Sequence, residues 1–389
     1  ALVAGPEAGH AFPAFALAER AVGAGHQVTV YTGPRWLPLA VERGLTVAEL
    51  PALTAQPGDD DDDAGAKLSV RAARMAVALA PLLAAAETEL VISDVITVAG
   101  GWAADLCGLP WIELSPHPLY APSRGLPPIG AGLAPGTGPR GRLRDTILRA
   151  MTARAVKTGE RQRVSAREEI GLAGPGEPSA RFIATLPGLE PARPDWPADT
   201  HLIGPLFFEP TVDELTIPDG DAPLVLICPS TAETGATGMA EQSLAAVTAL
   251  ARQRPLRVVY SALTLPGPEA GLPPGAVAGL GRQDLLLAAA DAVICGGGHG
   301  LLAKALSARI PVVTVPGGGD QWELASRVDR LGAGIAVRPA GAEAIAQAVA
   351  RVLDAPSYAR TAAGIAATAE QTVDPLPLIE RLLRRTACA

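Results

Sequence analysis

A histidine and an aspartate that are far apart in the sequence both follow apolar runs, and together they could handle one proton. His10 lies in the segment Gly9-His10-Ala11-Phe12-Pro13, after the first apolar run, and Asp94 ends the run Leu90-Val91-Ile92-Ser93-Asp94. If both runs are strands of one parallel sheet, their carboxyl ends lie about 5 to 10 Å apart. Imidazole could then remove the proton of an attacking hydroxyl while the carboxylate orients the ring. Alternatively, His10 caps a helix and Asp94 is a turn residue.

The segment Cys295-Gly296-Gly297-Gly298-His299-Gly300 passes from an apolar run into a helical pattern. Glycines at such a turn let the backbone approach a ligand while helix N–H groups point at it. The segment therefore predicts an anion site. It is not the dinucleotide-binding pattern, because the third glycine of that pattern would fall on Leu301. The alternative is a turn that is glycine-rich only because the packing there is tight.

Alternating apolar runs and helical patterns must position these residues. The first half predicts strands at 1–4, 27–32, 45–50, 90–94 and 111–114, and helices at 11–24, 36–43, 66–87 and 102–107. Such repetition predicts a parallel sheet. The Pro/Gly-rich stretch 115–141 has little periodicity, and its place after the carboxyl end of a strand favours a functional loop.

The second half repeats the same order. It predicts strands at 224–228, 257–260, 292–295, 311–315 and 334–337, and helices at 239–254, 283–290, 300–308 and 321–331, followed by two closing helices. The predicted fold class is α/β, with two Rossmann-like domains whose parallel sheets face a common cleft. We place the domains at 1–200 and 211–370, and a closing helix at 371–389 that can pack back on the first domain; the resemblance described next implies that the first domain binds the acceptor and the second the donor.

Several short motifs of the second half occur together at spacings that match a known family without gaps. They are Gly281-Arg282-Gln283, Leu286-Leu287, Ala290-Asp291, the glycine run, Pro311, Val315-Pro316-Gly317 and Asp320-Gln321. This set resembles the donor-binding signature of the family 1 glycosyltransferases, especially the bacterial members that glycosylate natural products. The resemblance extends over the whole chain, because Gly9-His10-x-x-Pro13 and Asp94 match the catalytic base of that family and its carboxylate partner.

The resemblance implies a GT-B fold and inverting transfer of a hexose from a nucleoside-diphosphate sugar to a hydroxyl of a small lipophilic acceptor. It also implies that Asp320 and Gln321 bind sugar hydroxyls. The donor side would further comprise Arg282 and Gln283 beside the nucleotide base, Gly297, Gly298, His299 and Gly300 around the diphosphate, and Ser230 and Thr231 beside phosphate and ribose. For Ser230 and Thr231, an ordinary turn is the alternative. No cofactor and no metal are expected, because backbone N–H groups and a helix dipole can stabilise the leaving diphosphate.

Three positions depart from the family pattern. Gly296 and Leu301 stand where the family commonly has a histidine and a hydroxyl that contact phosphate, and Lys304 replaces a glutamate that accepts the ribose hydroxyls. His299 and Lys304 are candidates to replace these contacts, since a lysine one turn into the helix can reach an anion; alternatively, both face solvent. The departures leave the nucleotide open between uridine and thymidine diphosphate.

Aromatic residues after the two strands at 90–94 and 111–114 suggest the acceptor side. The candidates for acceptor binding are Phe12, Trp102, His117 and Tyr120. Apolar, aromatic walls with few polar groups suit a lipophilic acceptor, such as a natural product or a lipid alcohol. The alternative for Trp102, and for Trp111 beside it, is a place in the core.

Composition limits the other classes of partner. The net charge is −8 and no Lys/Arg-dense stretch occurs, which argues against nucleic acid and anionic membrane surfaces. No apolar run reaches the roughly 18 residues of a membrane span. The four cysteines are far apart, which fits a reducing cytoplasm. The run 59–63 of five aspartates is read as a solvated loop, and no leader is recognised before the first apolar run.

From the sequence, two other functions remain open. Assembly into a homodimer also remains open. One of the two functions is a nucleotide-sugar epimerase or cell-wall transferase that shares the two-domain arrangement. The other is a catalytically silent subunit that activates a natural-product transferase, which the three departures favour. A silent subunit has no need of a base or of a sugar-binding pair, so His10, Asp94, Asp320 and Gln321 favour the enzyme.

Overall fold

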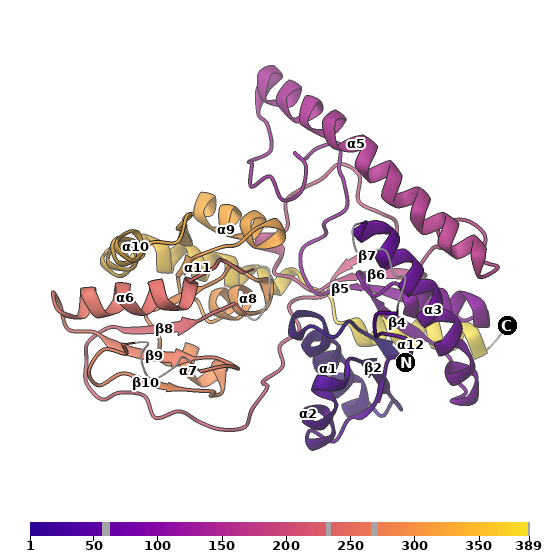
Figure 1. Cartoon of the computed structure of the whole chain (residues 1–389), viewed down its shortest axis with the longest axis horizontal. Helices are drawn as coiled ribbons and strands as arrows, with labels where there is room; N and C mark the ends of the chain where they lie inside the picture. Colours follow the sequence, from indigo (N-terminus) through magenta and orange to yellow (C-terminus); the bar gives the residue numbers. More distant parts are fainter. Residues whose placement is uncertain (57–62, 231–234, 266–270, 388–389) are drawn as a thin grey trace.

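A computed structural model describes residues 1–56, 63–230, 235–265 and 271–387. Within these ranges the chain forms two α/β halves, each built on one sheet of parallel strands (Figure 1). The two-sheet α/β prediction is therefore confirmed. Thr231, most of the aspartate run and Cys388 lie outside the described residues.

The sheet of the N-terminal half has seven strands in the order β3-β2-β1-β4-β5-β6-β7. They are β1 (Leu2–Val3), β2 (Thr29–Thr32), β3 (Thr46–Glu49), β4 (Val91–Asp94), β5 (Trp111–Ser115), β6 (Ala180–Ile183) and β7 (Thr200–Leu202). Alternate residues point to opposite faces, so Leu2 and Val3 enter different hydrophobic clusters. β1 and β4 are neighbours in the centre of the sheet, which brings the segments after them together.

Helices cover both faces of this sheet. They are α1 (Ala8–Gly23), α2 (Leu37–Glu42), α3 (Ala64–Ala85), α4 (Ala99–Cys107) and α5 (Gly138–Glu169), with short 3-10 turns η1 (Pro34–Trp36) and η2 (Pro187–Leu189). Asp63 caps α3 by accepting hydrogen bonds from Gly65 N–H and Ala66 N–H. By length and composition alone, Gly65–Ala85 could cross a membrane. In this fold, however, its buried side, including Leu79 and Leu83, packs in the core.

Helix α5 was not predicted. It projects from the N-terminal half at the top of Figure 1, and residues 150–157 are exposed on all sides. Nine of the 32 Lys and Arg residues of the chain lie on it. The expectation that no Lys/Arg-dense stretch exists is therefore wrong, although four acidic residues lie on the same helix.

The sheet of the C-terminal half has six strands in the order β10-β9-β8-β11-β12-β13. They are β8 (Leu224–Cys228), β9 (Arg257–Ser261), β10 (Val277–Gly279), β11 (Ala292–Cys295), β12 (Val312–Thr314) and β13 (Gly334–Ala336). Its helices are α6 (Met239–Ala251), α7 (Gln283–Ala289), α8 (His299–Ser307), α9 (Gly319–Leu331), α10 (Ala342–Asp354) and α11 (Ser357–Ala367). One face of the sheet packs on α6 and α10, and the other on α7, α8, α9 and α11.

The chain crosses between the halves twice. Residues 203–223 make the first crossing, in which Phe208 is buried in the N-terminal core and Leu215 packs on the C-terminal core. After the 3-10 turn η4 (Thr368–Gln371), the chain returns, and α12 (Pro375–Ala387) places Ile379 and Leu382 in the N-terminal core (Figure 1). In addition, Leu189 of η2 is buried in the C-terminal core. Each half therefore contributes residues to the hydrophobic core of the other half.

Tight packing between α4 and the sheet makes Gly100→Ala a test of the N-terminal core. A Cβ at Gly100 would lie 2.7 Å from Cβ of Val3 and 2.8 Å from Oγ of Ser93. We expect the variant to lose about 1–3 kcal/mol of unfolding free energy, since overpacking forces the helix off the sheet. Chemical denaturation measures this loss.

Gly159→Ala is the matched control, because a Cβ there meets nothing within 4 Å and the residue lies inside α5. It should be neutral or gain roughly 0.5–1 kcal/mol. Equal stability of the two variants would contradict the packing described for α4.

Candidate active site between the two halves

His10 and Asp94 meet where β1 and β4 end side by side. Nδ1 of His10 lies 2.6 Å from Oδ2 of Asp94. The other oxygen, Oδ1, accepts hydrogen bonds from Ile96 N–H (2.9 Å) and Thr97 N–H (3.0 Å). Because a carboxylate oxygen accepts, Nδ1 carries the proton and Nε2 keeps its lone pair. The prediction that the fold brings these two residues together is confirmed.

The ring of His10 is partly exposed, and a charge of the C-terminal half acts on it. Its side chain is 19% exposed, whereas that of Asp94 is 2% exposed. Burial lowers the pKa of His10, but the hydrogen bond to Asp94 and the charge of Asp94 outweigh it, and Asp320 and Glu7 add to the rise above the usual 6.5. Asp320 lies in the first turn of α9, in the other half of the molecule. A charge of the C-terminal half therefore contributes to the raised pKa of His10.

A row of rings leads away from His10 along the boundary between the halves. His117 contacts His10 edge-on at 6.2 Å between ring centroids, and Tyr120 stacks on His117 at 4.4 Å. The guanidinium of Arg327, from α9, lies 5.9 Å from the Tyr120 ring centroid. The Tyr120 hydroxyl is buried without a hydrogen-bond partner in the described part of the chain. The structure thus brings His117 and Tyr120, two predicted acceptor residues, into a line with the base.

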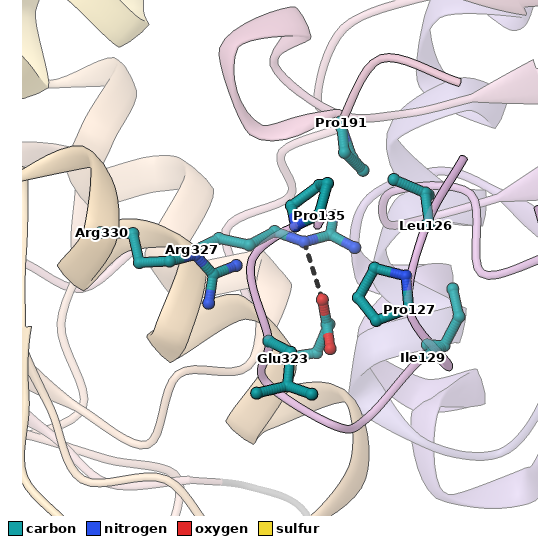
Figure 2. A pocket seen from close by; sticks show the side chains of 9 residues that line it. Leu126, Pro127, Ile129, Pro135, Pro191, Glu323, Arg327 and Arg330 are labelled. Atoms are coloured by element: carbon teal, nitrogen blue, oxygen red, sulfur yellow. Dashed lines mark hydrogen bonds and ion pairs between the residues drawn. The ribbon is translucent and has the colours of Figure 1, made fainter. Parts of the chain in front are cut away.

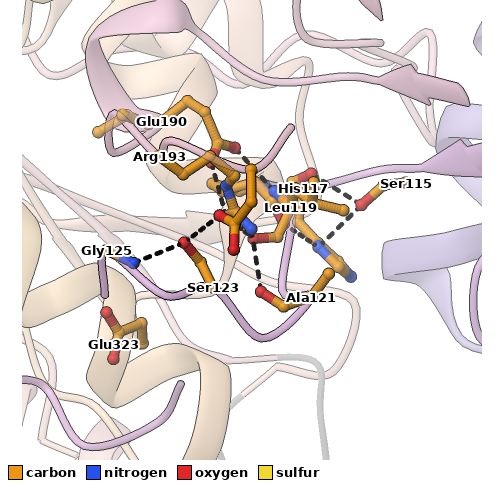
Figure 3. Close-up of polar contacts among 12 residues, drawn as sticks. Ser115, His117, Leu119, Ala121, Ser123, Gly125, Glu190, Arg193 and Glu323 are labelled. Atoms are coloured by element: carbon orange, nitrogen blue, oxygen red, sulfur yellow. Dashed lines mark hydrogen bonds and ion pairs between the residues drawn. The ribbon is translucent and has the colours of Figure 1, made fainter. Parts of the chain in front are cut away.

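A buried ion pair holds the segment that carries these rings, as Figure 3 shows. Arg193 donates to the carbonyl oxygens of Leu119 and Ala121 (2.9 Å for the latter), and Glu190 accepts from Leu119 N–H at 2.7 Å. Glu190 and Arg193 are themselves paired, and their side chains are almost fully buried. Burial raises the pKa of Glu190, although the Leu119 hydrogen bond and the charge of Arg193 oppose the rise. Sequence reasoning missed both residues, since charged side chains are usually solvated.

The glycine run forms the turn from β11 into α8. Gly297 has a φ of +81°, which favours glycine, and Gly298 is the N-cap of α8. A Cβ at Gly296 would lie 2.8 Å from Cβ of Ser230, so no side chain fits there. The first N–H groups of α8, at His299 and Gly300, have no partner within the helix by geometry. The turn is therefore built for a close backbone approach.

The side chains of His299 and Lys304 point at protein groups. Nε2 of His299 lies 2.9 Å from Oγ1 of Thr185 in the N-terminal half, and burial lowers the pKa of His299 to about 3. Lys304 Nζ donates to Oε1 of Glu209 (2.6 Å), Oε1 of Gln283 (2.9 Å) and the carbonyl oxygen of Phe208. This placement does not support the prediction that both side chains take over phosphate contacts. The low pKa of His299 leaves its ring uncharged, and the charge of Lys304 is paired with that of Glu209.

The remaining donor candidates are distributed along the same edge. Arg282 is partly exposed and forms an ion pair with Asp284. Gln321 is buried, and its amide donates to Oγ of Ser230 (3.0 Å) and accepts from Gly317 N–H (3.1 Å). These bonds fix the turn after β12 against the turn after β8.

Two acceptor candidates contribute to packing. Trp102 is 2% exposed in the core between α3, α4 and the sheet, so the prediction that it binds acceptor is wrong. Phe12 is half-buried and packs on Phe15, Trp36 and Phe208, at the start of the first crossing.

A small pocket of about 40 Å³ lies between the halves, next to the row of rings (Figure 2). Its N-terminal side is apolar, and its C-terminal side consists of charged residues of α9. The lining residues are Leu126, Pro127, Ile129, Leu133, Pro135, Pro191, Glu323, Arg327 and Arg330.

Comparison with known proteins decides what this arrangement is. Residues 272–383 match the family described as "Erythromycin biosynthesis protein CIII-like, C-terminal domain". The chain is 27% identical to 4'-demethylrebeccamycin synthase of Lentzea aerocolonigenes, over 97% of this chain and 98% of that protein. The Streptomyces sp. SF2575 glycosyltransferase SsfS6, complexed with thymidine diphosphate, aligns with a TM-score of 0.66 at 19% identity over 98% of both chains. The spinosyn rhamnosyltransferase SpnG, complexed with spinosyn aglycone, aligns with a TM-score of 0.70 at 21% identity, again over 98% of both.

The chain has the fold of the GT-B glycosyltransferases, and over nearly its whole length it is similar to bacterial enzymes that glycosylate natural products. In this fold, the carboxyl ends of both sheets face each other, which is where α/β folds bind ligands. Among the described residues, no group of three or more His, Cys, Asp or Glu side chains is arranged to hold a metal ion.

Three charged residues of α9 share a helix face with Asp320, and the sequence analysis did not predict them as part of the site. Asp320, Glu323, Arg327 and Arg330 recur at intervals of three and four, which places them on one helix face. Of these, Glu323 and Arg327 are buried. The spacing alone could have shown a shared face, but a charged face on a helix is usually solvated.

Proposed function

We propose that this glycosyltransferase moves a hexose from a nucleoside-diphosphate donor to a hydroxyl of a small lipophilic acceptor, with inversion at the sugar carbon. His10 takes the acceptor proton on Nε2, and Asp94 fixes the tautomer and stabilises the imidazolium. The observation that carries the proposal is the His10–Asp94 hydrogen bond at the carboxyl edge of the N-terminal sheet, to whose raised His10 pKa Asp320 of the other half contributes. Inversion follows from a one-step displacement by the activated hydroxyl.

The donor is proposed to lie on the C-terminal half, with its diphosphate at the turn 296–300. The N–H groups and dipole of α8 would stabilise the charge that grows on the leaving diphosphate, so no metal is needed. Asp320 is exposed at the first turn of α9 and would accept hydrogen bonds from sugar hydroxyls. Thymidine diphosphate is our first choice of nucleotide, because the aligned SsfS6 structure contains it. A cytoplasmic location belongs to the same proposal.

The acceptor is proposed to lie along His117 and Tyr120. Both rings are half-buried and lead from His10 to the apolar pocket, so they offer a flat surface of low polarity. The aglycone in the aligned SpnG structure supports a natural product as the acceptor.

One observation favours a catalytically silent subunit instead. Lys304, His299 and Gln321 are all held by protein groups, which leaves fewer side chains for a donor. A turnover screen separates the two functions. Purified protein is incubated with thymidine- and uridine-diphosphate hexoses and a panel of lipophilic alcohols, and nucleotide release and glycoside formation are followed by mass spectrometry. Nucleotide release with an inverted anomeric product supports the transferase, and no release from any donor would contradict it.

Asp320→Ala should raise the KM for the sugar donor at least tenfold, the equivalent of losing about one hydrogen bond to a charged group. Free nucleotide should bind with unchanged affinity, because the proposed contact is with the sugar. Titration with thymidine diphosphate and with its hexose derivative measures both. Equal weakening of both ligands would mean that Asp320 only supports the structure of α9.

A further inference from the structure

The N-terminal half reaches over to the C-terminal half through the segment 126–136, which follows the row of rings. The ends of this segment are fixed on α5. Arg149 donates to the carbonyl oxygen of Leu126 (2.7 Å), Arg144 donates to that of Ala134 (2.6 Å), and Gly136 N–H donates to Asp145 (2.6 Å). Its middle, residues 130–132, instead contacts α9.

Glu323 is the centre of the contact with α9. Gly130 N–H (3.1 Å) and Gly132 N–H (3.0 Å) both donate to its Oε2. These glycines have φ values of +83° and +65°, a conformation that other residues adopt only with strain. Two neighbouring carbonyl oxygens complete the contact, since Trp322 donates to that of Ala131 (3.3 Å) and Arg330 to that of Gly132 (2.6 Å).

The contacts of Glu323 need a side chain whose two oxygens both accept hydrogen bonds. Oε1 of Glu323 accepts from Nε of Arg327 at 3.2 Å, so the buried carboxylate faces three N–H donors and no acceptor. The Arg327 guanidinium also donates to the carbonyl oxygen of Leu189, which fixes it in place. A glutamine of the same shape has one oxygen and one NH₂ group, so in either orientation its NH₂ would meet at least one of these donors.

The segment 126–136, held on α9 by Glu323, forms the apolar wall of the pocket in Figure 2. Leu126, Pro127, Ile129, Leu133 and Pro135 line one side, opposite Arg327 and Arg330. Arg327 also closes the row of rings that starts at His10. The acceptor wall of the N-terminal half is thus placed by the helix that carries Asp320.

We propose that Glu323 is a positioning residue for the acceptor: by holding residues 130–132 on α9, it builds the apolar wall against which a lipophilic acceptor lies. This rests on the proposed function. The acceptor site is therefore complete only when both halves contribute, and the chemical class it takes is an apolar ring system that reaches from His10 to the pocket.

Glu323→Gln tests the proposal in two independent ways. Hydrogen exchange followed by mass spectrometry should show the amides of 126–136 exchanging at least about tenfold faster than in the unchanged protein, because a bond to a buried charge is lost. With an acceptor from the turnover screen, the KM for acceptor should rise at least about tenfold, while kcat at saturation and the affinity for thymidine diphosphate stay within about twofold. Glu343→Gln, an exposed glutamate on α10, is the matched control and should change neither.

The outcomes separate this inference from the proposed function. Unchanged exchange at 126–136, or faster exchange with an unchanged KM for acceptor, overturns the role of Glu323. Parallel loss of nucleotide affinity also overturns it, because it would mean that α9 itself is disrupted. If the unchanged protein transfers no sugar, the proposed function and with it the role of Glu323 toward an acceptor are both wrong, while the exchange result still decides whether Glu323 holds the segment.

Discussion

Replacing His10 with alanine should lower sugar transfer by about a thousandfold, within the range of 10²–10⁴ that a positioned general base contributes. The reason is that Asp94 holds the ring of His10 through Nδ1, which leaves Nε2 free to act as the base. Binding of the donor should persist, since the proposed diphosphate contacts come from α8. Steady-state transfer rates together with a thymidine-diphosphate titration measure both effects.

His26→Gln is the control for this variant. His26 follows the other end of α1, so the substitution changes the same residue type away from the cleft. It should keep the rate of the unchanged protein. Full activity in His10→Ala would remove His10 from the mechanism, and a loss of folding, seen by circular dichroism, would call for His10→Gln as the second variant.

Asp94→Asn should lower transfer by about 10²–10⁴-fold, because the wrong tautomer of the base is selected. Oδ1 of Asp94 is held by the N–H groups of Ile96 and Thr97, so the oxygen of the new amide stays there and its NH₂ faces His10. The NH₂ donates to Nδ1, which moves the ring proton to Nε2, and the base is lost.

The pH profile gives this variant a distinctive signature. The pKa of His10 is raised above the usual 6.5, mainly by Asp94 acting against burial. A base must be neutral, so the rate of the unchanged protein should fall as the pH drops through a value above 6.5. Without the carboxylate, burial dominates and the pKa falls, so the acid limb of Asp94→Asn should move to lower pH. If the acid limb of the pH–rate profile lies at the same pH in Asp94→Asn and in the unchanged protein, His10 does not titrate in the rate-limiting step.

The parts of the fold that could be predicted are those with strong local periodicity. The runs at 90–94 and 224–228 are apolar on both faces because both faces are covered, and they became β4 and β8. Asp94 was identifiable because it ends such a run, and His10 because it comes shortly after the first apolar run, in the first turn of α1. Parallel strands bring their carboxyl ends to one edge. That edge is where the structure has them.

The parts that escaped prediction lack this local signal. α5 carries charges on most faces and buries few residues, so its sequence has no apolar stripe. β6, β7 and β10 were also missed, although other strands of three or four residues, such as β12 and β13, were predicted. Glu323 and Arg327 resemble an ordinary exposed i, i+4 pair on a helix. They are buried because segments almost two hundred residues earlier in the chain pack on them, with Gly130 against Glu323 and Tyr120 against Arg327.

The second crossing of the chain limits how such enzymes can be recombined. α12 follows the C-terminal half in sequence, yet Ile379 and Leu382 are buried in the N-terminal core, and Val373 N–H donates to the carbonyl oxygen of Leu202. A hybrid that joins two parents only within 203–223 would bring a foreign last helix to a groove shaped for the native one. Chimeras should therefore be spliced at two points, with residues from about 372 onward taken from the same parent as the first 200.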